Sequence, residues 1–253
     1  MNSEILLIDK PSGMSSFGVV ARVRRILSEA AGHKVKVGHA GTLDPFATGL
    51  LVILTGKGTK RATEFLKLDK WYEATICLGK TSTTGDVEGE IKTCAKASEK
   101  SCDDYLMRAC ATNGERIERS LTRNDGMRRA SRISSCQTFL QDNFTGRIRQ
   151  RVPNYSAVKI NGQRAYKLAR EGKEVEMPTR EVEIYQLDLV DYKWPYLKIR
   201  CHVSSGTYIR TLGEDIGKAL GVGGYLTELR RTQIGDFKLK DAVPLEEWMK
   251  NRG

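Results

Sequence analysis

The sequence of 253 residues lacks several features that would indicate particular classes of protein. Its six cysteines form no Cys-x-x-Cys pair and it has only three histidines, so a structural zinc site has no support. No stretch approaches the roughly 20 apolar residues of a membrane-spanning helix. Neither an internal repeat nor a Pro- or Ser-rich linker divides the chain. We therefore expect a cytoplasmic chain with free thiols, no metal and no leader peptide ahead of the strand-like residues 5–8.

Positive charge is what the chain has in excess. It carries 42 lysines and arginines against 31 acidic residues, a formal net charge of +11, while its 40% of apolar residues is ordinary for a folded domain. A basic excess of this size indicates a polyanionic partner, either nucleic acid or an acidic membrane surface. A basic enzyme that is indifferent to RNA is the alternative.

The hydrophobic pattern predicts short strands and short helices without regular βαβ repeats, which favours a mixed α/β sheet. Asn161-Gly162 suits the turn of a hairpin, and a short helix should follow over 165–171 before Gly172. The main expected elements are strands at 5–8, 50–54, 72–78, 182–190 and 197–203, and helices at 17–27 and 209–220.

The stretch from about 94 to 150 is the least regular part of the sequence. From Arg108 to Arg151 it has ten arginines, no lysine and four acidic residues. We interpret residues 108–135 as a mobile basic insertion. Such an arm could contact RNA phosphates, or it could be a solvated loop without a function of its own.

Asp44 is the first candidate for chemistry. The stretch from Gly38 to Asp44 reads as a loop of small residues, and Pro45 disfavours a helical conformation of the residue before it. Anchored by the apolar run at 50–54, the loop would present one carboxylate on a stiff support. An ordinary turn or helix cap is the commoner role of an Asp beside Pro and Gly, and this feature alone favours that role.

A second candidate is the segment Ser204 to Arg210. If it continues the strand at 197–203 in extended form, Tyr208 and Arg210 share one face, because side chains alternate along a strand. Arg210 could then hold a carboxylate through paired hydrogen bonds. A structural ion pair under an aromatic ring is the alternative.

Two further side chains could contact an RNA base. Tyr72, beside Trp71, is a possible stacking platform for a base turned out of its helix, although a lone Tyr in a strand is more often core. His39 could contact a phosphate or the extruded base, but a lone histidine is weak support.

Together these segments resemble the TruB family of tRNA pseudouridine synthases. The Gly-x-Leu-Asp-Pro-x-Ala-x-Gly core is highly specific, and the matching segments cover nearly the whole chain in the family's order. They are residues 10–16, 38–51, 70–72, 155–159, 166–171, 206–210 and 229–231.

The resemblance implies a role for each matching residue. Asp44 corresponds to the catalytic aspartate, Tyr72 to the aromatic residue that stacks on the target uracil, and Arg210 to the partner of the aspartate. The other expected substrate-binding residues are His39, Tyr208, Leu229, Lys10 and Lys159. No cofactor and no metal are implied.

The resemblance also implies an architecture and a substrate. We expect one pseudouridine synthase domain over 1–253, with a large, mostly antiparallel mixed sheet flanked by helices and by insertions that grip RNA. Residues 155–178 would form a thumb that binds the T loop. The implied reaction converts uridine to pseudouridine at position 55 in the T stem-loop of tRNA, in a monomer that needs no protein partner.

The sequence departs from the common family pattern at its C-terminus. It ends at Gly253, so we expect no C-terminal RNA-binding module, and the basic insertion would partly replace one. Two other functions stay open at this point. One is the catalytic subunit of a guide-RNA-dependent pseudouridine synthase, and the other is an RNA-binding or tRNA-folding protein.

Overall fold

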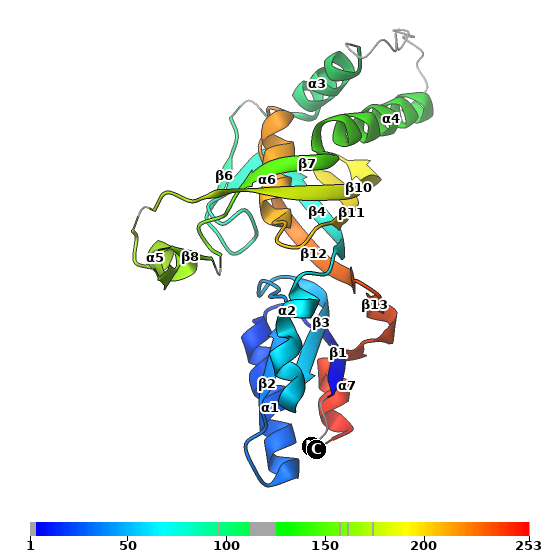
Figure 1. Ribbon diagram of the computed structural model, residues 1–253. Helices are drawn as coiled ribbons and strands as arrows, with labels where there is room; N and C mark the ends of the chain where they lie inside the picture. The colour runs from blue at the N-terminus through cyan, green and yellow to red at the C-terminus, as the bar shows by residue number, and fades with distance from the viewer. Residues whose placement is uncertain are drawn as a thin grey trace. The chain divides into compact units, whose positions relative to one another are not determined.

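The computed structural model describes residues 4–95, 97–111, 125–156, 158–160, 162–173 and 175–252. The chain forms two compact units, each assembled from separate segments (Figure 1). The first unit consists of Met1–Glu73, His202–Gly206 and Glu228–Gly253. The second consists of Ala74–Cys201 and Thr207–Thr227. Three of the four boundaries fall inside strands, at 73/74, 201/202 and 227/228, which explains why no linker-like composition marks them.

Ten strands form one mixed sheet, as expected for a mixed α/β fold. Its hydrogen-bonded order is β14-β1-β3-β12-β4-β11-β10-β7, with β2 paired to β3 and β13 paired to β12. The pairs β1/β14 and β3/β12 are parallel, whereas β1/β3, β2/β3, β7/β10 and β12/β13 are antiparallel. The strands are β1 (Ile5–Lys10), β2 (Val37–Ala40), β3 (Thr48–Thr55), β4 (Lys70–Leu78), β7 (Gly146–Arg151), β10 (Thr179–Lys193), β11 (Tyr196–Val203), β12 (Gly224–Ile234), β13 (Phe237–Lys238) and β14 (Val243–Pro244).

Strand β3 is buried on both faces, which accounts for its continuous apolar sequence. Leu51 and Ile53 pack with one face of helix α1 (Ser16–Ala31) and with α7 (Leu245–Lys250). The alternate residues Leu50, Val52 and Leu54 pack with Phe65 of the short helix α2 (Ala62–Leu66). This strand is therefore the rigid centre of the first unit, and the loop that carries Asp44 leads directly into it.

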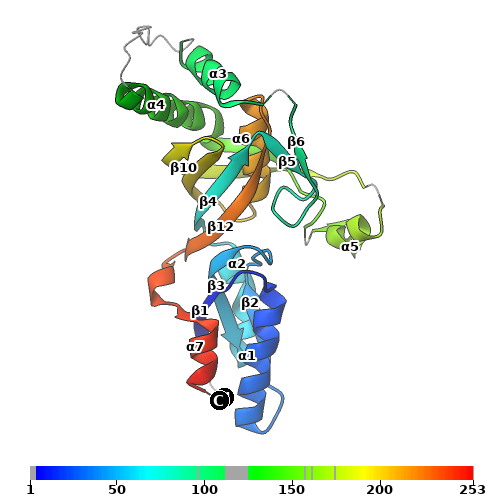
Figure 2. The same ribbon diagram turned by 180° about the vertical axis from the view of Figure 1, so that it is seen from behind.

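The second unit contains helices α3 (Glu99–Ala111), α4 (Asp125–Phe144) and α6 (Ile209–Ala219). Figure 2 shows α4 lying along β10. Strand β7 pairs with β10 only at residues 179–184. Beyond residue 184 the Gln137 side chain of α4 bonds to the backbone of β10 in place of β7. Its amide nitrogen donates to Leu187 O (3.0 Å) and its oxygen accepts from Leu189 N (2.5 Å).

The expectation of an irregular stretch from 94 to 150 is wrong, because α3 and α4 occupy most of it. Packing overrides the polar composition here: Cys136, Phe139 and Leu140 recur at helical spacing and are buried. Residues 112–124 of the basic insertion lie outside the described part of the chain.

Other sequence predictions are confirmed. Strands β8 (Lys159–Ile160) and β9 (Gln163–Arg164) form the expected hairpin, and α5 (Ala165–Arg170) ends before Gly172, whose φ is 69°. Two small strands, β5 (Lys80–Ser82) and β6 (Ile91–Thr93), pair with each other on either side of the polar turn at 83–90. Among the described residues, no helix is both long and apolar enough to cross a membrane.

Candidate active site

The loop that carries Asp44 connects β2 to β3 and begins three residues later than predicted. Gly38, His39 and Ala40 belong to β2, where they pair with β3 in the register His39↔Ile53. The predicted loop from Gly38 was wrong because pairing with the apolar β3 outweighs the low strand propensity of small residues. Residues 41–47 alone form the connection.

Backbone hydrogen bonds fix this loop at several points. Ala47 N donates to Asp44 O (3.1 Å), closing a tight turn with Pro45 at its second position, where proline is favoured. Gly13 N donates to Pro45 O (2.9 Å). The Ser16 hydroxyl donates to Leu43 O (2.9 Å) and accepts from Leu43 N (2.8 Å). Asp44 is half-buried, so the loop holds a carboxylate that solvent still reaches.

The buried side chain of Lys10 stabilises the loop. Its Nζ donates to the carbonyl oxygens of Pro11 (2.8 Å), Met14 (2.6 Å) and Pro45 (3.1 Å), and none of its surface is exposed. Our prediction that Lys10 binds substrate is therefore revised. A buried ammonium group that donates to three carbonyls serves the loop, because it joins the carbonyls of Pro11 and Met14 to that of Pro45, which also accepts from Gly13 N.

Arg231 is a second buried cation that the sequence reasoning missed. It is 1% exposed, and it donates from Nε to Leu50 O (2.9 Å) and from Nη2 to Gly41 O (3.0 Å). Its backbone passes so close to Gly49 that a Cβ there would lie 2.3 Å from Arg231 O. The Gly at 49 and the Arg pair at 230–231 were visible in the sequence, but their contact across 182 residues was not.

The first unit also contains three other predicted site residues. Tyr72 on β4 and Leu229 on β12 are both buried. His39 is partly buried, and its Nδ1 has no hydrogen-bond partner among the described residues. Burial, and secondarily the positive charge of Arg231, lowers the pKa of His39. A neutral imidazole can both donate and accept, which suits contacts with a base.

The second unit places Tyr208 and Arg210 differently from the prediction. The segment is not extended, because Gly206, with φ of 83°, turns the chain after β11 and α6 begins at Ile209. Tyr208 is the N-cap residue and Arg210 is already in the helix, so strand alternation does not put them on one face. Gln150 fixes Tyr208 instead: its amide nitrogen donates to Tyr208 O (3.3 Å) and its oxygen accepts from Tyr208 N (3.1 Å).

Arg210 is buried against the polar turn that follows β5. Its guanidinium donates to Thr84 O (2.9 Å) and Tyr155 O (2.8 Å), and lies 3.4 Å from the Asp86 carboxylate. Asp86 is 1% exposed and accepts from Thr84 Oγ1 (2.5 Å) and Glu88 N (3.0 Å). The sequence reasoning missed Asp86, since only the fold shows which carboxylate faces the arginine.

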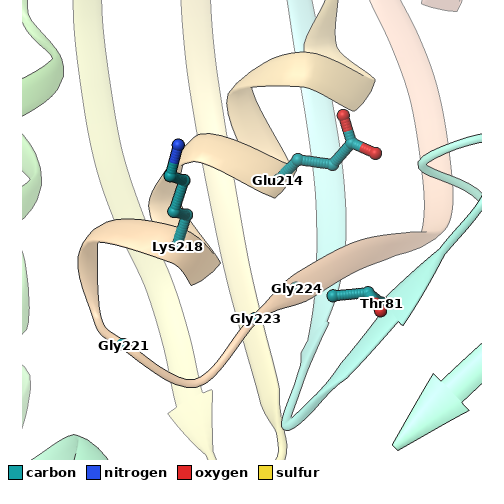
Figure 3. Close-up of a pocket in the computed structure, with 6 residues that line it drawn as sticks. All are labelled: Thr81, Glu214, Lys218, Gly221, Gly223 and Gly224. Carbon is teal, nitrogen blue, oxygen red and sulfur yellow. The ribbon is translucent and has the colours of Figure 1, made fainter. Parts of the chain in front are cut away.

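A cavity of about 370 Å³ lies beside α6 (Figure 3). Glu214, one helical turn after Arg210, lines it together with Lys218, Thr81 and three glycines at 221, 223 and 224. A Cβ at Gly85 would lie 2.8 Å from Glu214 Oε1, so the carboxyl group packs closely against the turn that holds Arg210. Burial raises the pKa of Glu214 to about 7, and the charge of Arg210 partly opposes this.

Lys159, the remaining predicted residue, is exposed on β8 of the second unit. Among the described residues, no group of three or more His, Cys, Asp or Glu side chains could hold a metal ion. The predicted site residues supply a carboxylate, two phenols, an imidazole, a guanidinium and two ammonium groups. A half-buried carboxylate on a fixed loop can act as a nucleophile.

Comparison with known proteins agrees with this arrangement. The model of the TruB family pseudouridylate synthase N-terminal domain matches residues 24–120 and 110–209, and that of the tRNA pseudouridylate synthase B C-terminal domain matches 210–251. A tRNA pseudouridine synthase B of Corynebacterium efficiens is 40% identical over 99% of this chain and 73% of its own length. The protein of that name from Phocaeicola vulgatus is 40% identical over 97% of this chain and 93% of its own.

Solved structures support the same fold. A chain in the crystal structure of a Cbf5–Nop10–Gar1 complex is 26% identical, with a TM-score of 0.61 over 97% of this chain and 53% of its own length. The expected fold class is thus confirmed by structure as well as by sequence. The coverage of both units by the two family models and the 40% identity to full-length relatives place the chain in the TruB family of pseudouridylate synthases.

Proposed function

We propose that this enzyme converts uridine to pseudouridine at position 55 in the T loop of tRNA, and that Asp44 is its nucleophile. The presentation of Asp44 carries the proposal. Two buried cations, Lys10 and Arg231, and the hydroxyl of Ser16 fix the backbone of its loop, which is more than a simple turn requires. The relatives named tRNA pseudouridine synthase B support the substrate.

The reaction is an isomerisation in which the bond from ribose C1′ to uracil N1 breaks and a bond from C1′ to C5 forms. The C5 proton is lost and N1 gains a proton, so no atom is gained or lost overall. Asp44 adds covalently to the sugar or to the base, or takes part in elimination to a glycal. Tyr72 stacks on the detached uracil.

Arg210 has the role of partner to the aspartate. The turn at residues 82–86 supports this role, because Asp86 and Thr84 O fix the guanidinium in the second unit. A guanidinium buried beside a carboxylate is permanently charged and well oriented. It therefore needs little reorganisation when negative charge develops during the reaction.

Binding must offset the cost of turning the target base out of a folded loop, a few kcal/mol. The net charge of +11 supplies phosphate contacts, and Lys159 on the exposed hairpin of the thumb is one of them. Tyr208, His39 and Leu229 hold the extruded nucleotide. With a lowered pKa, His39 is neutral at pH 7 and can donate to a uracil carbonyl.

The test uses the pure protein and an unmodified tRNA transcript, with pseudouridine mapped along the RNA. We expect one modified site, in the T loop. Asp44→Asn should lower the rate by at least about 10³-fold, as for loss of a nucleophile, while tRNA binding and stability persist. Asp236→Asn, an exposed aspartate of the same unit, is the matched control and should keep full activity.

Other outcomes would identify the competing functions. Product that forms only with an added guide RNA would indicate a guide-dependent subunit. Tight binding without product in the unaltered protein would indicate an RNA-binding or folding role.

A further inference from the structure

Four exposed lysines lie together in the first unit, away from the loop that carries Asp44. Lys34 and Lys36 flank the buried Val35 between α1 and β2, so both side chains point outward from one side of an extended segment. Lys57 and Lys60 belong to the 3₁₀ helix η1 (Gly56–Arg61), where residues three apart eclipse each other. We call these four residues the distal lysine cluster.

Hydrogen bonds hold the two halves of the cluster together. Gly56 N donates to Lys36 O (2.8 Å), joining the start of η1 to the residue before β2. Thr59 Oγ1 donates to Gly56 O (2.8 Å), which fixes the turn of η1. Arg24 of α1 adds a fifth cation, because its guanidinium donates to Val37 O (3.2 Å). The cluster is thus a defined surface, and not a set of independent chain ends.

Few negative charges oppose this cluster. The carboxylates of neighbouring segments are Glu4, Glu29 and Glu64, of which Glu64 lies 2.9 Å from Arg61 and Glu4 lies 3.9 Å from Arg252. In the described part of the chain, the four lysines form no salt bridge. A helix C-terminus favours a nearby cation, which accounts for Lys34 after α1 but not for Lys57 and Lys60.

The cluster and Asp44 lie at opposite ends of the β2–β3 hairpin. Val37 pairs with Thr55 at the end where the lysines lie, whereas Ala40 pairs with Val52 beside the loop at 41–47. Figure 1 shows the chain leaving α1 at the lower end of the first unit and returning as β2. The five residue steps from Lys36 to Gly41 span roughly 17 Å of extended chain. The lysines are therefore too far away to touch the reacting base.

We infer that the distal lysine cluster binds phosphates of the RNA that lie beyond the stem-loop containing the target uridine. This inference rests on the proposed function for the identity of the RNA. Lysines at fixed positions act as point charges for phosphates and carry no base specificity. The cluster would therefore bind a complete, folded tRNA but not a short stem-loop, because only the longer RNA has phosphates within its reach.

The test compares Lys36→Glu/Lys57→Glu with Lys238→Glu/Lys240→Glu, which makes the same change in charge elsewhere in the first unit. Both pairs are exposed. Affinity for full-length tRNA and for an isolated T stem-loop is measured over a range of salt concentrations. We expect the cluster variant to bind full-length tRNA about tenfold more weakly, with a salt slope lower by about two. Its affinity for the stem-loop should change no more than that of the control.

A milder variant, Lys36→Gln/Lys57→Gln, tests whether the effect is due to lost cations or to added repulsion. It should show the same reduction in salt slope with a smaller loss of affinity. Equal losses on both RNAs, equal losses in the control pair, or loss of binding to acidic phospholipid vesicles alone would overturn the inference. Because binding is measured without turnover, the predicted loss in a protein that forms no pseudouridine would uphold the cluster and refute the proposed function.

Discussion

The two units fix their functional side chains in different ways. In the first, the buried cations Lys10 and Arg231 donate to the backbone carbonyls of the loop around Asp44. In the second, the buried cation Arg210 is itself a proposed functional group, and a buried carboxylate, Asp86, lies against it. The difference shows two roles for a buried positive charge. It can fix the backbone around a proposed nucleophile, or it can itself be oriented to interact with the substrate or the nucleophile.

This comparison predicts different consequences when each contact is removed. Loss of a cation that serves the backbone should mainly reduce stability. Loss of a carboxylate that orients a functional cation should mainly reduce activity. Three substitutions test the distinction. We expect Lys10→Met to have the largest effect, Asp86→Asn a smaller one and Glu214→Gln the smallest.

Lys10→Met should have the largest effect. It removes a buried donor from three carbonyl acceptors, of which Pro45 O still accepts from Gly13 N, at a cost of about 2–4 kcal/mol in the free energy of unfolding. Chemical denaturation measures this loss, and Lys67→Met, at an exposed position of the same unit, is the control. A variant of normal stability with weaker RNA binding would restore Lys10 as a substrate-binding residue.

Asp86→Asn should mainly impair catalysis. The amide oxygen can still accept from Thr84 and Glu88 N, so we expect a loss of only about 1–2 kcal/mol in unfolding free energy. The charge opposite Arg210 is removed, and kcat should fall by about 10- to 100-fold with little change in KM. Asp191→Asn is a control on the same unit. A stability loss as large as that of Lys10→Met, with kcat preserved, would contradict the distinction.

Glu214→Gln should have the smallest effect, visible only in its pH dependence. The folded-state pKa of Glu214 is raised to about 7 from the ordinary glutamate value of 4.5, so between these values the folded state binds the extra proton and stability falls as pH rises. At pH 8 the glutamine variant should therefore be more stable than the unaltered protein, on the order of 1 kcal/mol after allowance for solvent. At pH 4.5 the two should be equal. Denaturation curves at both pH values would show whether the difference vanishes as required.

Much of this site was predictable from local sequence. The position of Asp44 before Pro45 and the apolar run of β3 were compatible with a carboxylate on a rigid support but alone favoured an ordinary turn, and the resemblance to the TruB family selected Asp44. The spacing around Ala165 predicted α5. Lys10 was recognised, but not its burial, because nothing local shows that the carbonyls of Met14 and Pro45 converge on its ammonium group. The contacts of Arg231 with Gly41 and of Arg210 with Thr84 span 190 and 126 residues, so only the fold reveals them.

Errors of prediction have the same physical origin. The segment at 207–210 followed a strand and was expected to stay extended, yet Gly206 turned the chain and α6 began at Ile209, with Ile209, Leu212 and Ile216 buried. The polar stretch at 94–150 concealed the buried face of α4. In both places tertiary packing selected a conformation that the neighbouring residues did not dictate.

The side chain of Gln137 has a consequence for engineering. By pairing with Leu187 O and Leu189 N it reproduces the two hydrogen bonds that a neighbouring strand would make where β7 has already ended. An open strand edge is a template for association with another chain, and here a single amide closes it. A shortened enzyme that removed α4 would expose this edge, and would need a charged or proline-containing substitute there to stay monodisperse.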